Sequence, residues 1–284
     1  MTITDALITP FADYAFMRRA LAACVILAIS GAPLGVFMNL RRMSLVGDAM
    51  SHAILPGVSI AFLMFGLSVW PMTIAALGTG LAVAVIAFGL TRVTQLKEDA
   101  SFTLVYLLSL ASGVVMVSQS GSGVDLLHIL FGNILAIDNA SLVLAAGVAC
   151  LSVIILSQSY RGLVIDCFDP DFMRAGTHGR SIIGHVFFVL VVVNLVASFQ
   201  ILGTLMSLGL MLLPAISGRF WTDNIDAAIV LSTAIAIISS VIGLLISYHL
   251  SIPSGPAVVL VTGVFACVSV LFGRQGSLKA YLAR

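Results

Sequence analysis

The sequence predicts an all-α integral membrane protein, a single-domain bundle of about nine membrane-spanning helices that occupies residues 1–284. Its composition is the first reason: 60% of the residues are hydrophobic and 9% are charged, against roughly 25% charged residues in soluble domains. The second reason is that apolar runs close to the ~20 residues needed to cross a bilayer recur along the chain. The net charge of +1 gives no support for nucleic-acid binding.

The predicted spans are apolar segments separated by short polar breaks. They lie at residues 17–40, 44–65, 71–92, 100–118, 138–158, 181–199, 201–220, 225–248 and 254–272. The block 181–220 also allows a division that gives eight spans. Residues 1–16, which mix acidic and apolar side chains, predict an interfacial lead-in. Residues 123–137 are apolar but too short to cross, so they predict a re-entrant half-helix, which must be surrounded by protein or a cavity.

Basic residues in the predicted loops indicate the orientation of the chain. With nine spans, one set of loops carries eleven Lys and Arg residues, and the opposite set carries only Arg18 and Arg19. Cytoplasmic loops of membrane proteins carry an excess of Lys and Arg. The sequence therefore predicts a multi-pass protein with its C-terminus in the cytoplasm and its N-terminus outside. Eight spans would move the N-terminus to the cytoplasm.

The most polar of the predicted cytoplasmic loops is residues 159–180. Within it, Asp169 followed by Pro170 is a favourable helix start, with the cap at Asp169 and proline at the first helical position. A short helix over 170–175 would then lie on the cytoplasmic face. This segment is either a solvated connector, which composition alone favours, or a docking helix for a cytoplasmic partner.

Asp48 and His52 are the ionisable pair on which a functional hypothesis depends. They stand four residues apart in the apolar run 41–62, so their side chains lie on one face of the predicted helix. His52 is ten residues beyond Arg42, or ~15 Å along a helix, which is about half of a ~30 Å hydrocarbon core. Ionisable groups at this depth are costly, and they are usually functional.

Pro56 adds a backbone feature at the same depth. Because proline has no N–H, the carbonyl of His52 loses its usual helical partner, and a freed oxygen could lie beside the two side chains. Carboxylate oxygen and imidazole nitrogen suit a divalent transition metal such as Zn²⁺ or Mn²⁺. The alternative is a buried Asp–His hydrogen bond that fixes helix packing.

Further candidates lie in and around the predicted half-helix. Asp125 stands at its start and either completes a site with Asp48 and His52 or caps a helix after a glycine-rich stretch. His128 is three residues further on and is better explained by packing or the lipid interface than by metal binding. The remaining histidines are interpreted in the same structural way: His178, His185 and His249.

The chain lacks the sequence signatures of several other classes of protein. Lys97 and Lys279 are the only lysines, so there is no phosphate-binding GxxxxGK[ST] loop, and a nucleotide-driven motor would be another chain. The absence of HExxH argues against an intramembrane metalloprotease. The four scattered cysteines indicate neither a disulfide framework nor a thiolate zinc site. A carrier driven by an ion gradient, with Asp48 as a proton relay, stays open as an alternative.

Several segments taken in order resemble the permease subunit of bacterial ABC importers for zinc and manganese. The resemblance extends from about Arg41 to Phe272, and its ordered set of motifs is more specific than any one of them. The segments are RRMSLVGDAMSHAILPGVSIAF (41–62), DLLHILFGNILAI (125–137), DPDFMRAG (169–176), SFQILGTLMSLGLMLLPAISGR (198–219) and IPSGPAVVLV (252–261).

This resemblance implies a non-enzymatic transport subunit in the bacterial inner membrane. Its implied partners are a second permease copy, a cytoplasmic ATP-binding subunit that hydrolyses ATP, an extracytoplasmic metal-binding protein and membrane lipid. No permanently bound cofactor is implied, and the transported ion is zinc or manganese. Asp48, His52 and Asp125 match family positions associated with metal. The family's ATPase-contact segment is matched by Asp169, Pro170, Asp171, Phe172 and Arg174. His128 departs from the expected pattern, which leaves zinc and manganese both open.

Overall fold

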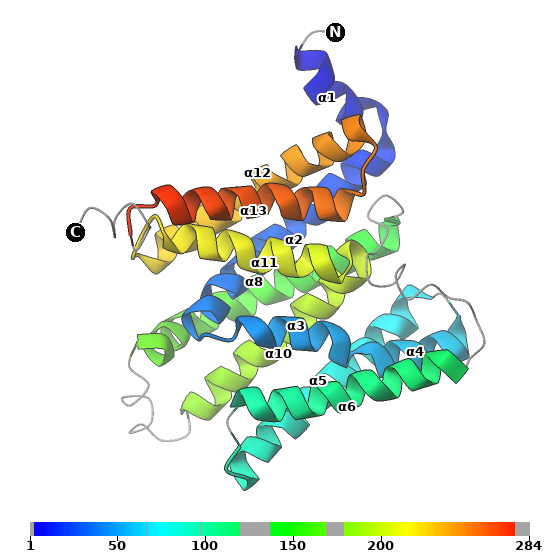
Figure 1. The fold of residues 1–284 in the computed structure, drawn as a ribbon, viewed down its shortest axis with the longest axis vertical. Coiled ribbons are helices and arrows are strands. Elements are labelled where there is room, and N and C mark those ends of the chain that lie inside the picture. The colour runs from blue at the N-terminus through cyan, green and yellow to red at the C-terminus, as the bar shows by residue number, and fades with distance from the viewer. Residues whose placement is uncertain (1–2, 67, 97, 120–136, 169–178, 276–284) are drawn as a thin grey trace.

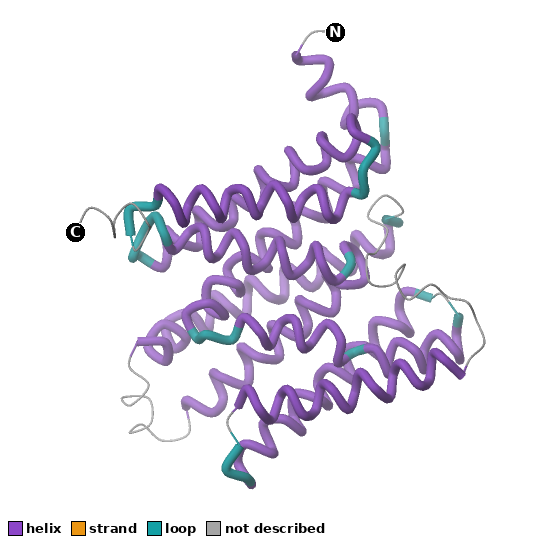
Figure 2. The backbone as a smooth tube through the Cα atoms, in the orientation of Figure 1, coloured by secondary structure: helices purple, strands orange, loops and turns teal. Residues whose placement is uncertain are grey.

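The computed structural model describes residues 3–66, 68–96, 98–119, 137–168 and 179–275. Within these ranges the regular secondary structure is all helix, with loops and turns between the helices and no strand (Figure 2). Figure 1 shows a bundle of long helices with short links. The helices are α1 (Ile3–Asp13), α2 (Ala15–Leu40), α3 (Ser44–Ala53), α4 (Leu55–Phe65), α5 (Val69–Val93), α6 (Glu98–Gln119), α8 (Asn139–Phe168), α10 (Gly179–Leu202), α11 (Thr204–Arg219), α12 (Ile225–Leu250) and α13 (Ser254–Phe272).

The predicted all-α membrane class is confirmed. In the described part of the chain, seven helical segments are long and apolar enough to cross a membrane by length and composition. Two shorter apolar helical segments, Ala100–Met116 and Thr204–Arg219, fall on the predicted spans 100–118 and 201–220. The predicted half-helix at 123–137 lies almost entirely outside the described residues.

One predicted helix end is wrong. Helix α8 continues to Phe168, ten residues beyond the predicted end of its span at residue 158, so the first half of the predicted loop 159–180 is helical. The polar and charged residues beyond position 158, such as Arg161, predict a loop. A helix that leaves the apolar layer can continue through such residues because its backbone hydrogen bonds stay satisfied within the helix.

The N-terminal end of α8 shows ordinary capping chemistry. The side chain of Asp138 accepts the backbone N–H of Ser141 at 2.8 Å. Hydrogen bonds from the Ser141 side chain and backbone hold the pKa of the Asp138 carboxyl below its usual range. An ionised carboxylate at this position also interacts favourably with the positive end of the helix dipole.

The helices form two packed groups joined by α10. Helix α2 packs against α8, α11 and α12, and α13 packs against α11 and α12; the other group is α3–α6, in which α4, α5 and α6 pack against one another. Helix α10 contacts α8 and α11 of the first group and α3 and α5 of the second. Figure 1 shows α2 and α11–α13 in the upper part of the view and α4–α6 in the lower part. The seam where α3 meets α11 is therefore a boundary between two helix groups.

The links between helices gather at the two ends of the bundle. Figure 1 shows the α2–α3, α5–α6 and α11–α12 links at one end, together with the C-terminus, and the α4–α5 and α12–α13 links at the other. The predicted spans therefore alternate in direction along these stretches of the chain.

Candidate metal site

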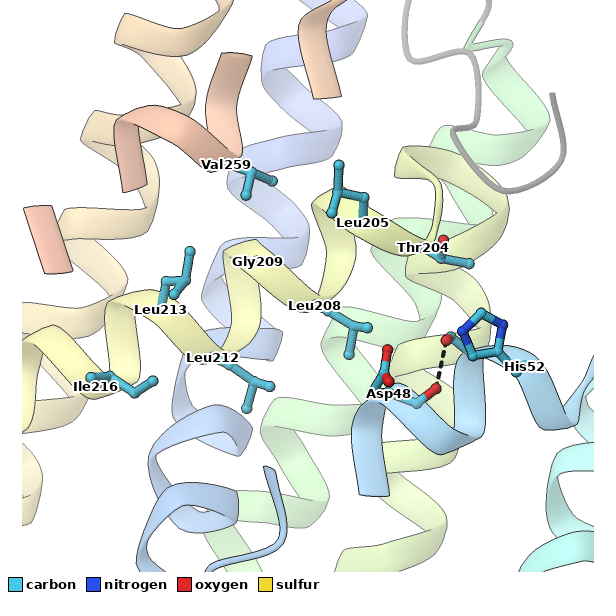
Figure 3. A pocket seen from close by; sticks show the side chains of 11 residues that line it. Asp48, His52, Thr204, Leu205, Leu208, Gly209, Leu212, Leu213, Ile216 and Val259 are labelled. Carbon is cyan, nitrogen blue, oxygen red and sulfur yellow. Dashed lines mark hydrogen bonds between the residues drawn. The ribbon is translucent and has the colours of Figure 1, made fainter. Parts of the chain in front are cut away.

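A cavity of about 570 Å³ lies at the seam between α3 and α11. Its polar lining comes from Asp48, Ser51 and His52 on α3 and from Thr204 at the start of α11. The rest of its lining is apolar or glycine: Leu205, Leu208, Gly209, Leu212, Leu213, Ile216 and Val259. Figure 3 shows Asp48 and His52 on α3 and, facing them, Thr204 and Leu208 on α11. The cavity is thus an apolar pocket with four polar side chains in its lining.

Asp48 and His52 line this one cavity, as their spacing of one helical turn predicts. Asp48 is exposed and His52 is half-buried. Within the described part of the chain the two side chains are not hydrogen-bonded to each other. The alternative in which they form a buried pair that fixes helix packing is therefore not what the structure shows. Both groups instead have atoms available to a ligand in the cavity.

The helix that carries the pair is shaped by a local hydrogen bond. The hydroxyl of Ser51 donates to the backbone carbonyl of Asp48 at 2.6 Å, the dashed line in Figure 3. Ser51 is buried, and its bond stays within its own helix turn. The bond ties the side chain of Ser51 to the backbone beside Asp48, one turn of helix below His52.

The membrane-crossing segment Ser44–Phe65 is broken just beyond His52. Helix α3 ends at Ala53 and α4 begins at Leu55, with Pro56 in its first turn. The sequence predicts a single span over 44–65 in which Pro56 only frees a carbonyl, so the break between α3 and α4 is a difference from that prediction. The expected free carbonyl is not found, however, because the backbone N–H of Ile54 donates to the carbonyl oxygen of His52 at the break. The next carbonyl, that of Ala53, accepts the hydroxyl of Ser109 from α6 at 2.7 Å.

Helix α6 can support the break because it approaches it closely. A Cβ atom on Gly113, one turn beyond Ser109, would lie 3.0 Å from the Cβ of Leu55 and 3.0 Å from the backbone nitrogen of Pro56. The glycine therefore provides the space in which α6 lies against the broken segment. Sequence reasoning predicted a lost hydrogen bond at Pro56 but identified neither the break nor this support.

The opposite wall of the cavity is helix α11 of the same chain. Sequence reasoning did not identify α11 as this wall. The signal in the sequence that could have indicated the role of α11 is the spacing of glycines at its start and within it. Gly203, which precedes α11, has φ 81° and ψ 165°, a conformation essentially restricted to glycine. A Cβ on Gly209 would lie 2.8 Å from Val259, so α11 and α13 also pack closely here.

Other predicted site residues are not placed by the structure. Asp125 and His128 lie outside the described residues. The same holds for the predicted ATPase-contact residues Asp169, Pro170, Asp171, Phe172 and Arg174, and for His178. Among the residues that the structure does describe, no group of three or more His, Cys, Asp or Glu side chains is arranged to hold a metal. Asp48 and His52 are thus the two residues of the predicted metal site that the structure describes.

Two further histidines, His185 and His249, each lie beside an aromatic ring. The ring of His185 lies 5.3 Å from that of Phe88, within a cluster that also contains Phe102 and Phe188. The ring of His249 lies 5.3 Å from that of Tyr248. Neither histidine lines the cavity beside Asp48.

Comparisons with known proteins agree with this arrangement. The chain is 30% identical over 268 residues to the manganese import system permease protein ScaB of Streptococcus gordonii. The match covers 94% of this chain and 95% of ScaB. It is 30% identical over 270 residues to the chelated iron transport system membrane protein YfeD of Yersinia pestis. That match covers 95% of this chain and 89% of YfeD.

A solved structure shows the same fold. The structure described as PsaBC from Streptococcus pneumoniae in complex with Fab superposes with a TM-score of 0.85 at 28% identity, and the match covers 99% of both chains. The family model of the ABC 3 transport family matches residues 13–273, which is nearly the whole sequence. The chain therefore belongs to the ABC 3 transport family.

Proposed function

We propose that this chain is the membrane-spanning permease of an ATP-driven importer that moves a divalent transition metal ion into a bacterial cytoplasm. The observation that carries the proposal is the placement of Asp48 and His52 on one cavity within a helical segment apolar enough to cross the membrane. Family membership and the metal-import names of ScaB and YfeD support it.

Manganese is the first ion to test. Carboxylate and hydroxyl oxygens suit Mn²⁺, and Asp48, Ser51 and Thr204 supply such oxygens to the cavity beside the imidazole of His52. The name of ScaB supports manganese, that of YfeD supports iron, and imidazole is also a good ligand for zinc. Competition among the three ions during uptake distinguishes them.

The importer would need other chains. ATP hydrolysis would reside in a cytoplasmic ATP-binding subunit, an extracytoplasmic metal-binding protein would deliver the ion, and a second permease copy would complete the membrane pathway. Asp125 is proposed as a further metal ligand. The contact with the ATPase is assigned to the segment that contains Asp169, Pro170, Asp171, Phe172 and Arg174.

The proposed arrangement in the inner membrane has nine crossings with the C-terminus in the cytoplasm. The clustering of the α2–α3, α5–α6 and α11–α12 links at one end of the bundle supports it, because the basic residues of these loops then face the cytoplasm (Figure 1). The segment 123–137 would enter from the outer side and return to it.

Uptake by cells that lack their own copy of this chain tests the site. Asp48→Asn and His52→Ala should each lower manganese uptake by at least about tenfold, because a lost attraction of even ~1.4 kcal/mol lowers occupancy tenfold. Asp223→Asn is the matched control, since Asp223 is an exposed carboxylate in the α11–α12 link and does not line the cavity.

Two results would contradict the proposal. Normal uptake of manganese, zinc and iron by both variants would remove Asp48 and His52 from the metal path. Uptake driven by an ion gradient in vesicles that contain this chain alone would identify it as a secondary carrier instead.

A further inference from the structure

A partly buried ion pair joins two helices at the end of the bundle where the α2–α3 link lies. Arg41 directly follows α2, Asp166 lies in the last turn of α8, and their side chains form a salt bridge in which they are 14% and 10% exposed. The guanidinium of Arg41 also lies over the ring of Phe187 on α10, 4.7 Å from its centre. One side chain therefore connects α2, α8 and α10.

The link from Arg41 to the metal-site helix is short and internally bonded. The backbone N–H of Met43 donates to the carbonyl of Met38 at 2.9 Å, and that of Arg42 donates to Asn39 at 3.2 Å. With Arg42 at φ 59°, these two bonds form a Schellman motif. Helix α3 then begins at Ser44, four residues before Asp48. Only Arg42 and Met43 therefore separate Arg41 from the base of α3.

The other partner of the salt bridge stands at the end of α8. Phe168, two residues beyond Asp166, is the last residue of that helix. The next residue in the sequence is Asp169, where the predicted ATPase-contact segment begins. Asp166 is thus close in sequence to that segment and in contact with Arg41.

We propose that the Arg41–Asp166 ion pair is the joint through which movement of the end of α8 reaches helix α3 and its metal-binding residues. Separating the two groups would leave a partly buried charge without its counter-charge, which is strongly unfavourable, so Arg41 and Asp166 move together. Both are positioning residues, since neither lines the cavity beside Asp48. This inference rests on the proposed function, because it assumes that ATP hydrolysis in a partner chain drives transport.

The test uses the complete transporter, reconstituted in vesicles with its ATP-binding subunit and its metal-binding protein. Asp166→Asn nearly preserves shape and removes the charge, and Arg41→Gln removes the other charge. The double variant Arg41→Asp with Asp166→Arg restores an ion pair with exchanged signs. Arg274→Gln is the matched control, because it removes an exposed positive charge just beyond α13, outside the link between α2 and α3.

Both manganese uptake and ATP hydrolysis are measured, so that a coupling defect is separated from a folding defect. In the single variants, uptake per ATP hydrolysed should fall by about tenfold, within the usual range of coupling free energies, while the ATP-binding subunit still co-purifies. The exchanged pair should recover a large part of the ratio, and Arg274→Gln should leave it unchanged.

Two results would overturn the inference. One is an unchanged ratio of uptake to hydrolysis in both single variants. The other is a loss of uptake that follows a loss of assembled complex, which would make the ion pair only a structural contact. A failure of the proposed function can be told apart from a failure of this inference. If the proposed function were wrong, the unaltered transporter would show no ATP-dependent metal uptake.

Discussion

Gly203 determines how the wall of the cavity opposite Asp48 is placed. Its backbone N–H donates to the carbonyl of Phe199 at 2.9 Å, and its own carbonyl accepts the hydroxyl of Ser207 at 2.7 Å. These bonds end α10 and begin α11 within one residue. The positive φ of Gly203 permits this change of direction, which places Thr204 on the cavity.

Replacing Gly203 with alanine should therefore destabilise the protein. A side chain at φ 81° and ψ 165° costs ~1–3 kcal/mol, so Gly203→Ala should lower the melting temperature in detergent and reduce metal uptake. Gly147→Ala is the control, since Gly147 is exposed on α8 and nothing lies within 4 Å of a Cβ there. Equal melting temperatures for the two variants would contradict this role of Gly203.

At the scale of elements, the broken segment α3–α4 gives the site its shape. The break places a turn of backbone, instead of continuous helix, directly beyond His52, and α6 supplies the hydroxyl of Ser109 as a partner for the buried carbonyl of Ala53. Unsatisfied carbonyls are costly in lipid, so the break depends on this neighbouring helix.

Ser109→Ala should consequently weaken the break. The carbonyl of Ala53 would lose its side-chain partner, at a cost of about 0.6–2 kcal/mol, which thermal unfolding in detergent would detect. Ser112→Ala is a matched control, because the exposed hydroxyl of Ser112 donates only to the carbonyl of Ser109 in its own helix at 2.7 Å. A larger loss of stability in the control would show that the contact between α6 and the break is unimportant.

At the scale of the whole molecule, the candidate site lies where two helix groups meet. Helices α2, α8 and α11–α13 form one group and α3–α6 form the other, with α10 in contact with both. A cavity at such a seam changes shape when the groups move relative to each other. This property suits a transported ion, which must be bound and then released.

The proposed nine crossings can be tested by thiol labelling. In a variant that lacks the four native cysteines, single cysteines at Ser68 and Ile252 should react with a membrane-impermeant reagent in right-side-out vesicles. Cysteines at Leu96 and Gln275 should react only in inside-out vesicles, because the positive-inside bias places those links in the cytoplasm. If the cysteines at Ser68 and Ile252 react from opposite sides, the chain has eight crossings.

The sequence by itself determined the membrane class, the approximate limits of most spans, and the shared face of Asp48 and His52. These features depend on local rules: apolar run length, helical periodicity and the missing N–H of Pro56. The same local rules ended α8 too early, because they do not show that a helix can continue through charged residues once it leaves the apolar layer.

The tertiary structure decided which parts of the chain meet. It placed α11 opposite Asp48, gave the carbonyl of Ala53 its partner Ser109, and brought Arg41 to Asp166 across 125 residues of sequence. No periodicity or spacing contains this information, because the partners are selected by how whole helices pack. Packing in turn depends on close approaches at residues such as Gly209 and Gly113, which matter only once the neighbouring helix is known.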